Sequence, residues 1–119
     1  MKLNSTGFVR GMMSKSTETE VYFKHVVKTI GHQLEKWDEH YEVKLLQNLL
    51  EETSYDVIVK LEDKTYQINL ELPFVEALQN KSPYALDRHI WESLKKEGLT
   101  IEKTHGDYLE NVLCKHLKI

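Results

Sequence analysis

The histidines and acidic residues of the predicted first helix are the first candidates for chemistry. The chain has six histidines, and His25 and His32 share one side of that helix. Glu35 and Glu39 lie near the same side, so a metal ion would have to bind between His32 and these two carboxylates. Helical metal sites use spacings such as HExxH or paired ExxH, and the sequence has neither. We therefore interpret these residues as a solvated polar face and predict no metal and no cofactor.

A nucleophilic site would have to use Cys114, since the chain has one cysteine. Cys114 and His116 are two positions apart and point in different directions on a helix, so they do not form a dyad within it. His105 would act as a base only if the fold brings it to the thiol. A single cysteine near a helix end is otherwise a small packed side chain, and we predict no catalytic residue.

The remaining polar clusters and the large aromatic residues have structural interpretations. Paired carboxylates at 38–39, 51–52 and 62–63 fall at predicted helix ends or turns, where solvated charge is ordinary. The five glycines are dispersed and form no phosphate-binding loop. Trp37 and Trp91 are predicted to pack in the core or at its rim rather than to anchor a partner.

Composition limits the class of protein. The length of 119 residues fits one domain, and 40% apolar with 29% charged residues is typical of a soluble globular protein. A single cysteine excludes an internal disulfide, which fits a reducing compartment. The N-terminus lacks the long apolar run of a signal peptide or membrane span. A cytoplasmic location is therefore expected. The net charge of −3, with dispersed Lys and Arg, argues against nucleic-acid binding.

The clearest structural signal is a hairpin predicted for residues 55–62 and 65–72. Both segments alternate apolar and polar side chains, the period of a strand with one buried face. A turn at Asp63-Lys64 would pair Val59 with Ile68, and each apolar side chain on that face would meet another. Flanking elements must cover this face, because a hairpin is marginally stable by itself.

Helical periodicity precedes the hairpin. Residues 17–20 match a capping box, and an apolar stripe at helical spacing continues to Trp37. A second stripe, in a different phase, runs from Tyr41 to Leu50. It predicts either a second helix after a break near Asp38 or one bent helix over residues 17–52.

Helical signals also follow the hairpin. Pro73 opens a short predicted helix, and Ser82-Pro83 opens a longer one that Gly98 ends. Residues 99–103 alternate briefly and predict a third strand, before a last helix that begins at Asp107.

These elements predict an α+β fold. A small, mainly antiparallel sheet would consist of the hairpin 55–62/65–72 and the short strand 99–103, covered on one face by about four helices. Residues 17–119 would form this single domain, and residues 1–16 a loosely ordered N-terminal segment.

The chain as a whole resembles short, uncharacterised cytosolic proteins of Bacillus-type bacteria. No motif carries this resemblance, and it implies no activity, ligand or site residue. A well-specified fold without a reactive cluster predicts a non-enzymatic protein-interaction module, whose partner is another protein or a second copy. The leucine stripe of the helix predicted over residues 38–52 would mediate that self-association. The alternative is a small enzyme or ligand-binding domain whose site is assembled from dispersed residues.

Removal of metal ions is expected to leave the fold intact, because the sequence lacks ligands at metal-binding spacing. Thermal melting after extensive dialysis against a chelator should give an unchanged Tm. A fall of several degrees that added zinc restores would contradict this prediction.

Overall fold

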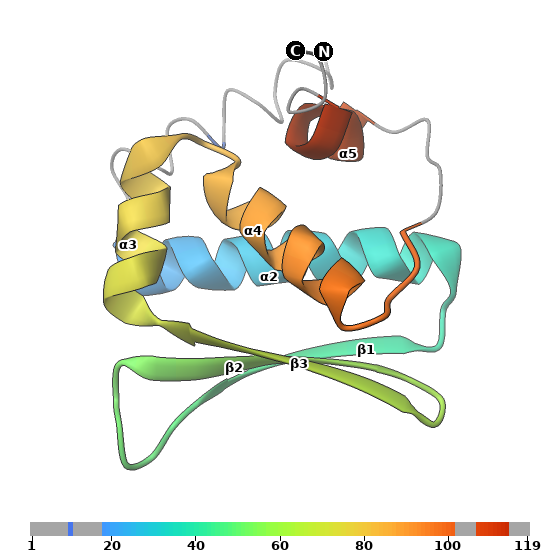
Figure 1. Ribbon diagram of the computed structural model, residues 1–119, viewed down its shortest axis with the longest axis horizontal. Helices are drawn as coiled ribbons and strands as arrows, with labels where there is room; N and C mark the ends of the chain where they lie inside the picture. Colours follow the sequence, from blue (N-terminus) through green and yellow to red (C-terminus); the bar gives the residue numbers. More distant parts are fainter. Residues whose placement is uncertain (1–9, 11–17, 102–106, 115–119) are drawn as a thin grey trace.

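The structure is a computed structural model that describes residue 10 and residues 18–101 and 107–114. Its sheet contains three antiparallel strands in the order β1-β2-β3 (Figure 1). The strands are β1 (Tyr41–Gln47), β2 (Ser54–Leu61) and β3 (Lys64–Glu71). The predicted α+β fold class is therefore confirmed.

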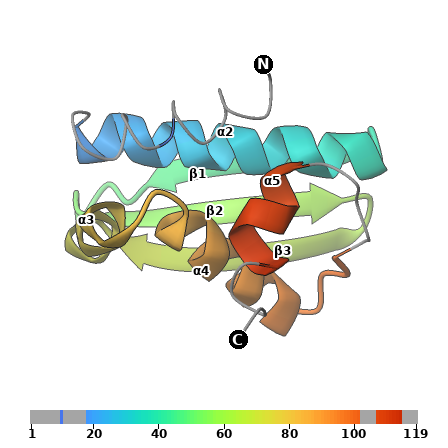
Figure 2. The ribbon, with the colours of Figure 1, turned by 90° about the horizontal axis from the view of Figure 1, so that it is seen from above.

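The described helices lie on the same face of the sheet (Figure 1). They are α2 (Thr19–Trp37), α3 (Leu72–Lys81), α4 (Ala85–Lys96), the short α5 (Asp107–Leu109) and the π-helical turn η1 (Glu110–Cys114). Seen from above, α2 runs along the β1 side of the sheet, while α3 and α4 cover the β3 side (Figure 2). The predicted helices after Pro73 and after Ser82-Pro83 correspond to α3 and α4, and Gly98 has the predicted left-handed backbone, with φ 108°.

The hairpin has the predicted faces but a different register. Val59 pairs with Tyr66 and Val57 with Ile68, so the predicted pairing of Val59 with Ile68 was wrong by two residues. The turn is at Glu62-Asp63 rather than Asp63-Lys64, and Glu62 has a positive φ of 56° to close it. Because side chains alternate with period two, a shift of two residues keeps every side chain on its predicted face.

The segment after α2 is the main correction to the predicted elements. The helix ends at Trp37 with Asp38 as its C-cap, as one alternative predicted, but residues 41–47 form strand β1 instead of a second helix. The predicted strand over 99–103 was also wrong: residues 99–101 have no strand structure, and residues 102–103 lie outside the described part of the chain. β1 is stable as a strand because Tyr41, Val43 and Leu45 extend the apolar face of β2.

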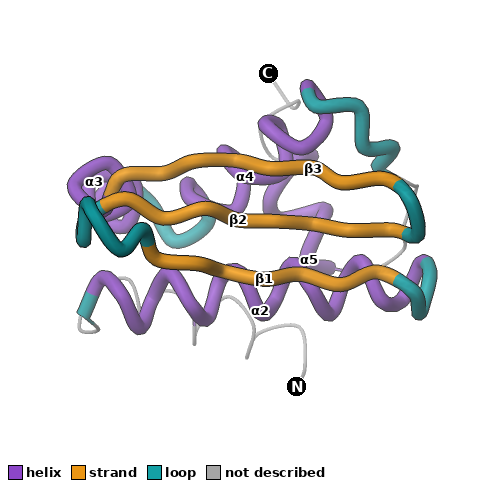
Figure 3. Tube along the Cα trace, turned by 90° about the horizontal axis from the view of Figure 1, so that it is seen from below, coloured by secondary structure: helices purple, strands orange, loops and turns teal. Residues whose placement is uncertain are grey.

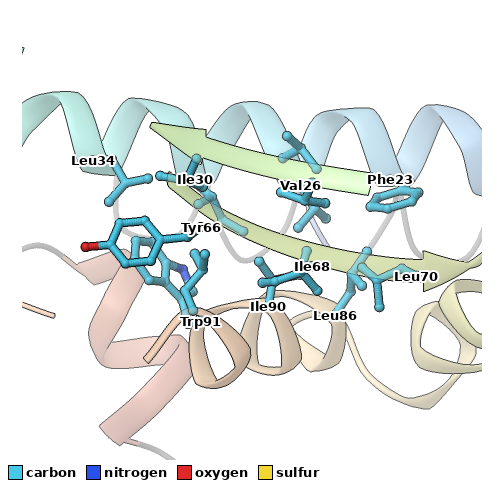
Figure 4. Close-up of a cluster of buried hydrophobic side chains, with 14 of the residues drawn as sticks. Phe23, Val26, Ile30, Leu34, Tyr66, Ile68, Leu70, Leu86, Ile90 and Trp91 are labelled. Carbon is cyan, nitrogen blue, oxygen red and sulfur yellow. The ribbon is translucent and has the colours of Figure 1, made fainter. Parts of the chain in front are cut away.

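The core lies between the sheet and the inner faces of α2 and α4 (Figure 4). Side chains of α2 and α4 meet those of β3, including Phe23, Val26, Ile30 and Leu34 from α2, Leu86, Ile90 and Trp91 from α4, and Tyr66, Ile68 and Leu70 from β3. Trp91 is fully buried, with its ring centroid 5.7 Å from that of the half-buried Trp37. This packing agrees with the predicted structural role of both tryptophans.

The N-terminal prediction concerns residues that are mostly outside the described part. Arg10 is described and is buried, whereas residues 1–9 and 11–17 are not described. The predicted loosely ordered segment and the Thr17 half of the capping box therefore stay predictions. Glu18 is the N-cap of α2 and makes no side-chain capping hydrogen bond.

The assignment of faces predicts contrasting effects for two neighbouring residues of β2. Val59→Asp places a charge on the fully buried face and should lower the free energy of unfolding by about 4 kcal/mol or more. Lys60→Asp changes an exposed side chain on the other face and should have an effect within about 1 kcal/mol. Urea denaturation measures both, and a larger loss for Lys60→Asp would contradict the assignment.

Candidate functional site

A groove of about 350 Å³ lies between α2 and the edge strand β1. Both elements run side by side at this edge of the sheet (Figure 3). From β1 the groove is lined by Tyr41, Val43 and Leu45. From α2 it is lined by Lys24, Val27, Lys28, Gly31, His32 and Glu35. Apolar side chains therefore face each other across the groove, and charged side chains of α2 surround them.

A second hollow continues the groove toward the start of α2. It measures about 340 Å³ and shares Lys24 and Leu45 with the first, so the two follow one another along β1. Its remaining lining residues are Glu20, Gln47 and Tyr55. Together the hollows extend over most of the length of β1, the length of a short extended peptide.

Gly31 keeps the middle of the groove open. A Cβ atom at this position would lie 3.6 Å from both Cβ and Cγ2 of Val43, which is ordinary van der Waals contact. A larger side chain at this position would extend into the space between helix and strand. Glycine in a helix interior costs about 1 kcal/mol relative to alanine, so the open groove has a cost in helix stability.

The backbone of β1 presents hydrogen-bonding groups to this groove. The amide of Asn48 donates to the carbonyl of Ser54 at 2.8 Å, so the backbone N–H and C=O groups of Asn48 and of every second residue before it point toward β2. By that alternation the N–H and C=O groups of Val43 and Leu45 point away from β2, toward the open edge. Within the described part of the chain these outward groups of Val43 and Leu45 have no hydrogen-bond partner.

In β1 the residues whose backbone groups point to the open edge are also those whose side chains lie on the helix-covered face. Val43 and Leu45 point their side chains to the helix-covered face while their free backbone groups point outward. A strand added beside β1 would form hydrogen-bonded pairs with these two residues. The side chains of its paired residues would then enter the groove beneath α2, and those between them would lie on the uncovered face.

A hydrogen bond at one end of the groove fixes α2 to the sheet. The hydroxyl of Tyr55 donates to the carboxylate of Glu20, and the Tyr55 ring packs edge-on against Phe23 with centroids 5.5 Å apart. The hydrogen bond to Glu20, with burial as a smaller cause, raises the pKa of Tyr55 to about 12. Since this pKa lies well above neutrality, the Tyr55 donor is present at physiological pH.

The residues considered for a metal site do not converge. His32 and Glu35 line the groove, Glu39 is exposed beyond the end of α2, and His25 is half-buried. Burial, with the positive charges of Arg10 and Lys28, lowers the pKa of His25. Within the described residues no group of three His, Cys, Asp or Glu side chains is placed to hold a metal ion.

The residues considered for nucleophilic catalysis mostly lie outside the described part of the chain. His105 and His116 are not described, and of Cys114 only the backbone at the end of η1 is described. A site that uses Cys114 therefore stays a prediction. No helix in the described ranges is long and apolar enough to cross a membrane.

A buried polar cluster around Asp87 was missed by the sequence analysis. Asp87 is fully buried in the first turn of α4 and forms an ion pair with Arg10, which is 2% exposed. The hydroxyl of Tyr108 donates to Asp87 at 2.5 Å, and the indole N–H of Trp91 donates to that hydroxyl at 3.1 Å. Burial raises the pKa of the Asp87 carboxyl, although Arg10 opposes the change.

The Asp87 cluster has a structural role. It joins residue 10, α4 and α5, and its carboxylate is shared between two donors rather than directed at an open space. One signal was present in the sequence: Asp87 stands three and four residues before Ile90 and Trp91, on the apolar stripe of its helix. A carboxylate at a core position requires a buried partner.

Comparison with known proteins found no matching family model, no similar curated protein and no similar solved structure. The resemblance to short cytosolic Bacillus-type proteins therefore stays a prediction.

Loss of the Asp87 carboxylate should be strongly destabilising. Asp87→Ala leaves Arg10 as an unpaired buried charge, and the free energy of unfolding should fall by about 3–5 kcal/mol. Tyr108→Phe removes one neutral donor and should cost about 1–3 kcal/mol.

Glu92→Ala provides the matched control, because Glu92 is an exposed carboxylate on the same helix. It should change stability by less than about 0.5 kcal/mol in urea denaturation. An Asp87→Ala protein as stable as the Glu92→Ala protein would show that the cluster does not join these segments.

Proposed function

We propose that this chain is a non-enzymatic protein-interaction module that binds an extended segment of a partner protein as a fourth strand beside β1. The proposal rests on the outward N–H and C=O groups of Val43 and Leu45, which have no hydrogen-bond partner among the described residues and lie next to a groove of about 350 Å³. We propose the cytoplasm as its compartment, because a single cysteine suits a reducing environment.

Strand addition uses the two features of this groove together. Main-chain hydrogen bonds to a sheet edge contribute affinity for any extended segment, and pockets for alternate side chains contribute selectivity. Val43 and Leu45 offer the backbone groups, and Val27 and Gly31 shape the pocket above them. An exposed edge without such a pocket would favour indiscriminate aggregation instead.

The opposite edge of the sheet lacks this combination. The amide of Leu72 donates to the carbonyl of Thr53 at 2.7 Å, which fixes the β2–β3 ladder and directs the backbone groups of Thr65, Gln67 and Asn69 outward. The side chains of these three residues are exposed on the uncovered face. A strand added there would direct its paired side chains into solvent, so β3 provides hydrogen bonds without selectivity.

A second copy of the chain is the alternative occupant. The predicted self-association through a helix over residues 38–52 loses its basis, since this segment is β1 and the loop that follows it. Antiparallel pairing of two β1 strands centred on Lys44 would put two lysines directly opposite each other, which is unfavourable. Leu49 and Leu50, 94% and 95% exposed in the loop after β1, do not line the groove. We therefore favour a different protein as the partner.

The proposal predicts that blocking the β1 edge abolishes peptide binding. A random decapeptide library displayed on phage is selected on the full chain, and the enriched peptides are measured by calorimetry. Val43→Pro removes an outward N–H without breaking a bond to β2, so the fold should persist while binding is lost. Hydrogen exchange at the amides of Val43 and Leu45 should slow in the complex.

Two further variants make the test specific. Gln67→Pro makes the equivalent change at the β3 edge and should leave binding unchanged. Gly31→Leu fills the groove without altering the strand and should weaken binding. If it does, the loss of binding in Val43→Pro cannot be attributed to a β1 strand weakened by proline. If no peptide is enriched, or if enriched peptides bind the Val43→Pro and Gly31→Leu variants as tightly as the original chain, the proposal is wrong. A mass twice 14.0 kDa in light scattering, abolished by Val43→Pro, would assign the edge to a second copy instead.

A further inference from the structure

Two lysines stand side by side on the helical wall of the groove. Lys24 and Lys28 are exposed, four residues apart on α2, and both line the groove. Within the described part of the chain neither forms an ion pair with a carboxylate. Like charges at this spacing destabilise a helix slightly, so a negative group bound between them would relieve their repulsion.

Among the other titratable side chains along the groove, the nearest carboxylate is that of Glu20, one helical turn before Lys24 in the second hollow. Glu20 accepts the hydrogen bond from Tyr55 at one end, and Glu35 lies nearly two helical turns beyond Lys28 at the other. His32 is the neighbour of Lys28 on the same wall. The chain carries a net charge of −3, so the basic section is a local feature rather than a consequence of composition.

The side chains of an added strand that pair with Val43 and with Leu45 would meet different parts of the groove. A Cβ atom added at Gly31 would already contact Val43, so a bound residue paired with Val43 would meet an apolar surface where helix and strand approach each other closely. Leu45 and Lys24 line both hollows, while Lys28 lines the first and Glu20 the second. A bound residue paired with Leu45 would therefore face Lys24 most directly, with Lys28 on one side and Glu20 on the other. Residues paired with Val43 and Leu45 are two positions apart in an added strand, and both direct their side chains into the groove.

We propose that the groove selects acidic segments: an extended peptide with Asp or Glu opposite Leu45 and a small apolar residue opposite Val43, two positions away. This inference rests on the proposed strand addition and specifies which partner sequences it accepts. The carboxylate is bound between Lys24 and Lys28, while the apolar side chain packs against Val27 and Val43. Complementary charge at the rim of an interface contributes mainly to selectivity and association rate.

A charge exchange tests the selectivity. Peptides selected from the decapeptide library on the original chain should carry Asp or Glu two positions from a small apolar residue. Replacing that acid by its amide, Asn or Gln, should weaken binding about tenfold, as expected for the loss of contacts to two exposed cations. The double variant Lys24→Glu, Lys28→Glu should bind the acidic peptide more weakly still, and a new selection on it should enrich Lys or Arg at the same position.

The matched control is Lys81→Glu with Lys96→Glu, which makes the same change in net charge at exposed sites on α3 and α4. It should keep the affinity and the acidic preference of the original chain. Enriched peptides that require the Val43 edge but show no acidic preference would overturn the inference and leave strand addition standing. So would equal binding of the acidic peptide to the original chain and to the Lys24→Glu, Lys28→Glu variant. Failure to enrich any peptide would overturn both proposals.

Discussion

The apolar face of a three-stranded sheet has to be buried from one side, and this constraint determines where each helix lies. Apart from Leu61 and Lys64 beside the turn, the side chains of β2 and β3 on that face are buried, while the alternate residues of β3 are exposed. A single helix is too narrow to cover three strands, since strands are about 5 Å apart and a helix is about 10 Å wide. α2 and α4 therefore divide the sheet between them, and Trp37 at the end of α2 meets Trp91 in the middle of α4. Because α2 lies toward the outside of its half, the edge of β1 remains open beneath it.

Much of this architecture follows from local patterns in the sequence, and the exceptions have physical causes. The faces of the hairpin, the helices α3 and α4 and the stop at Gly98 were predictable from side-chain period and turn chemistry. The segment from Tyr41 to Leu50 was not, because Leu45, Leu46, Leu49 and Leu50 have helical spacing while Tyr41, Val43 and Leu45 have strand spacing. Pairing with β2 selects the strand pattern. Because the pairing partners are residues 54–61, the pattern within residues 41–50 does not show which structure forms.

The candidate groove was hidden for the same reason. Its lining residues on α2 and β1 are close in sequence, and Lys24, His32 and Glu35 look like an ordinary solvated helix face. They become one wall of a groove only when residues 41–47 form an edge strand. The Asp87 cluster is different: its members come from widely separated positions, so the sequence showed one unusual core carboxylate and no indication of its partners.

The contacts of Asp87 also imply an order of assembly. The ladders β1–β2 and β2–β3 join segments that are neighbours along the chain, so closing them costs little loop entropy. The ion pair between Arg10 and Asp87 spans 77 residues, and Tyr108 reaches the same carboxylate from 21 residues downstream. During synthesis Arg10 can form its ion pair only after α4 has emerged from the ribosome, and Tyr108, the second donor to the carboxylate, emerges later still. We therefore expect the hairpins to form early, while the burial of this charge pair belongs to the last, slowest stage of folding.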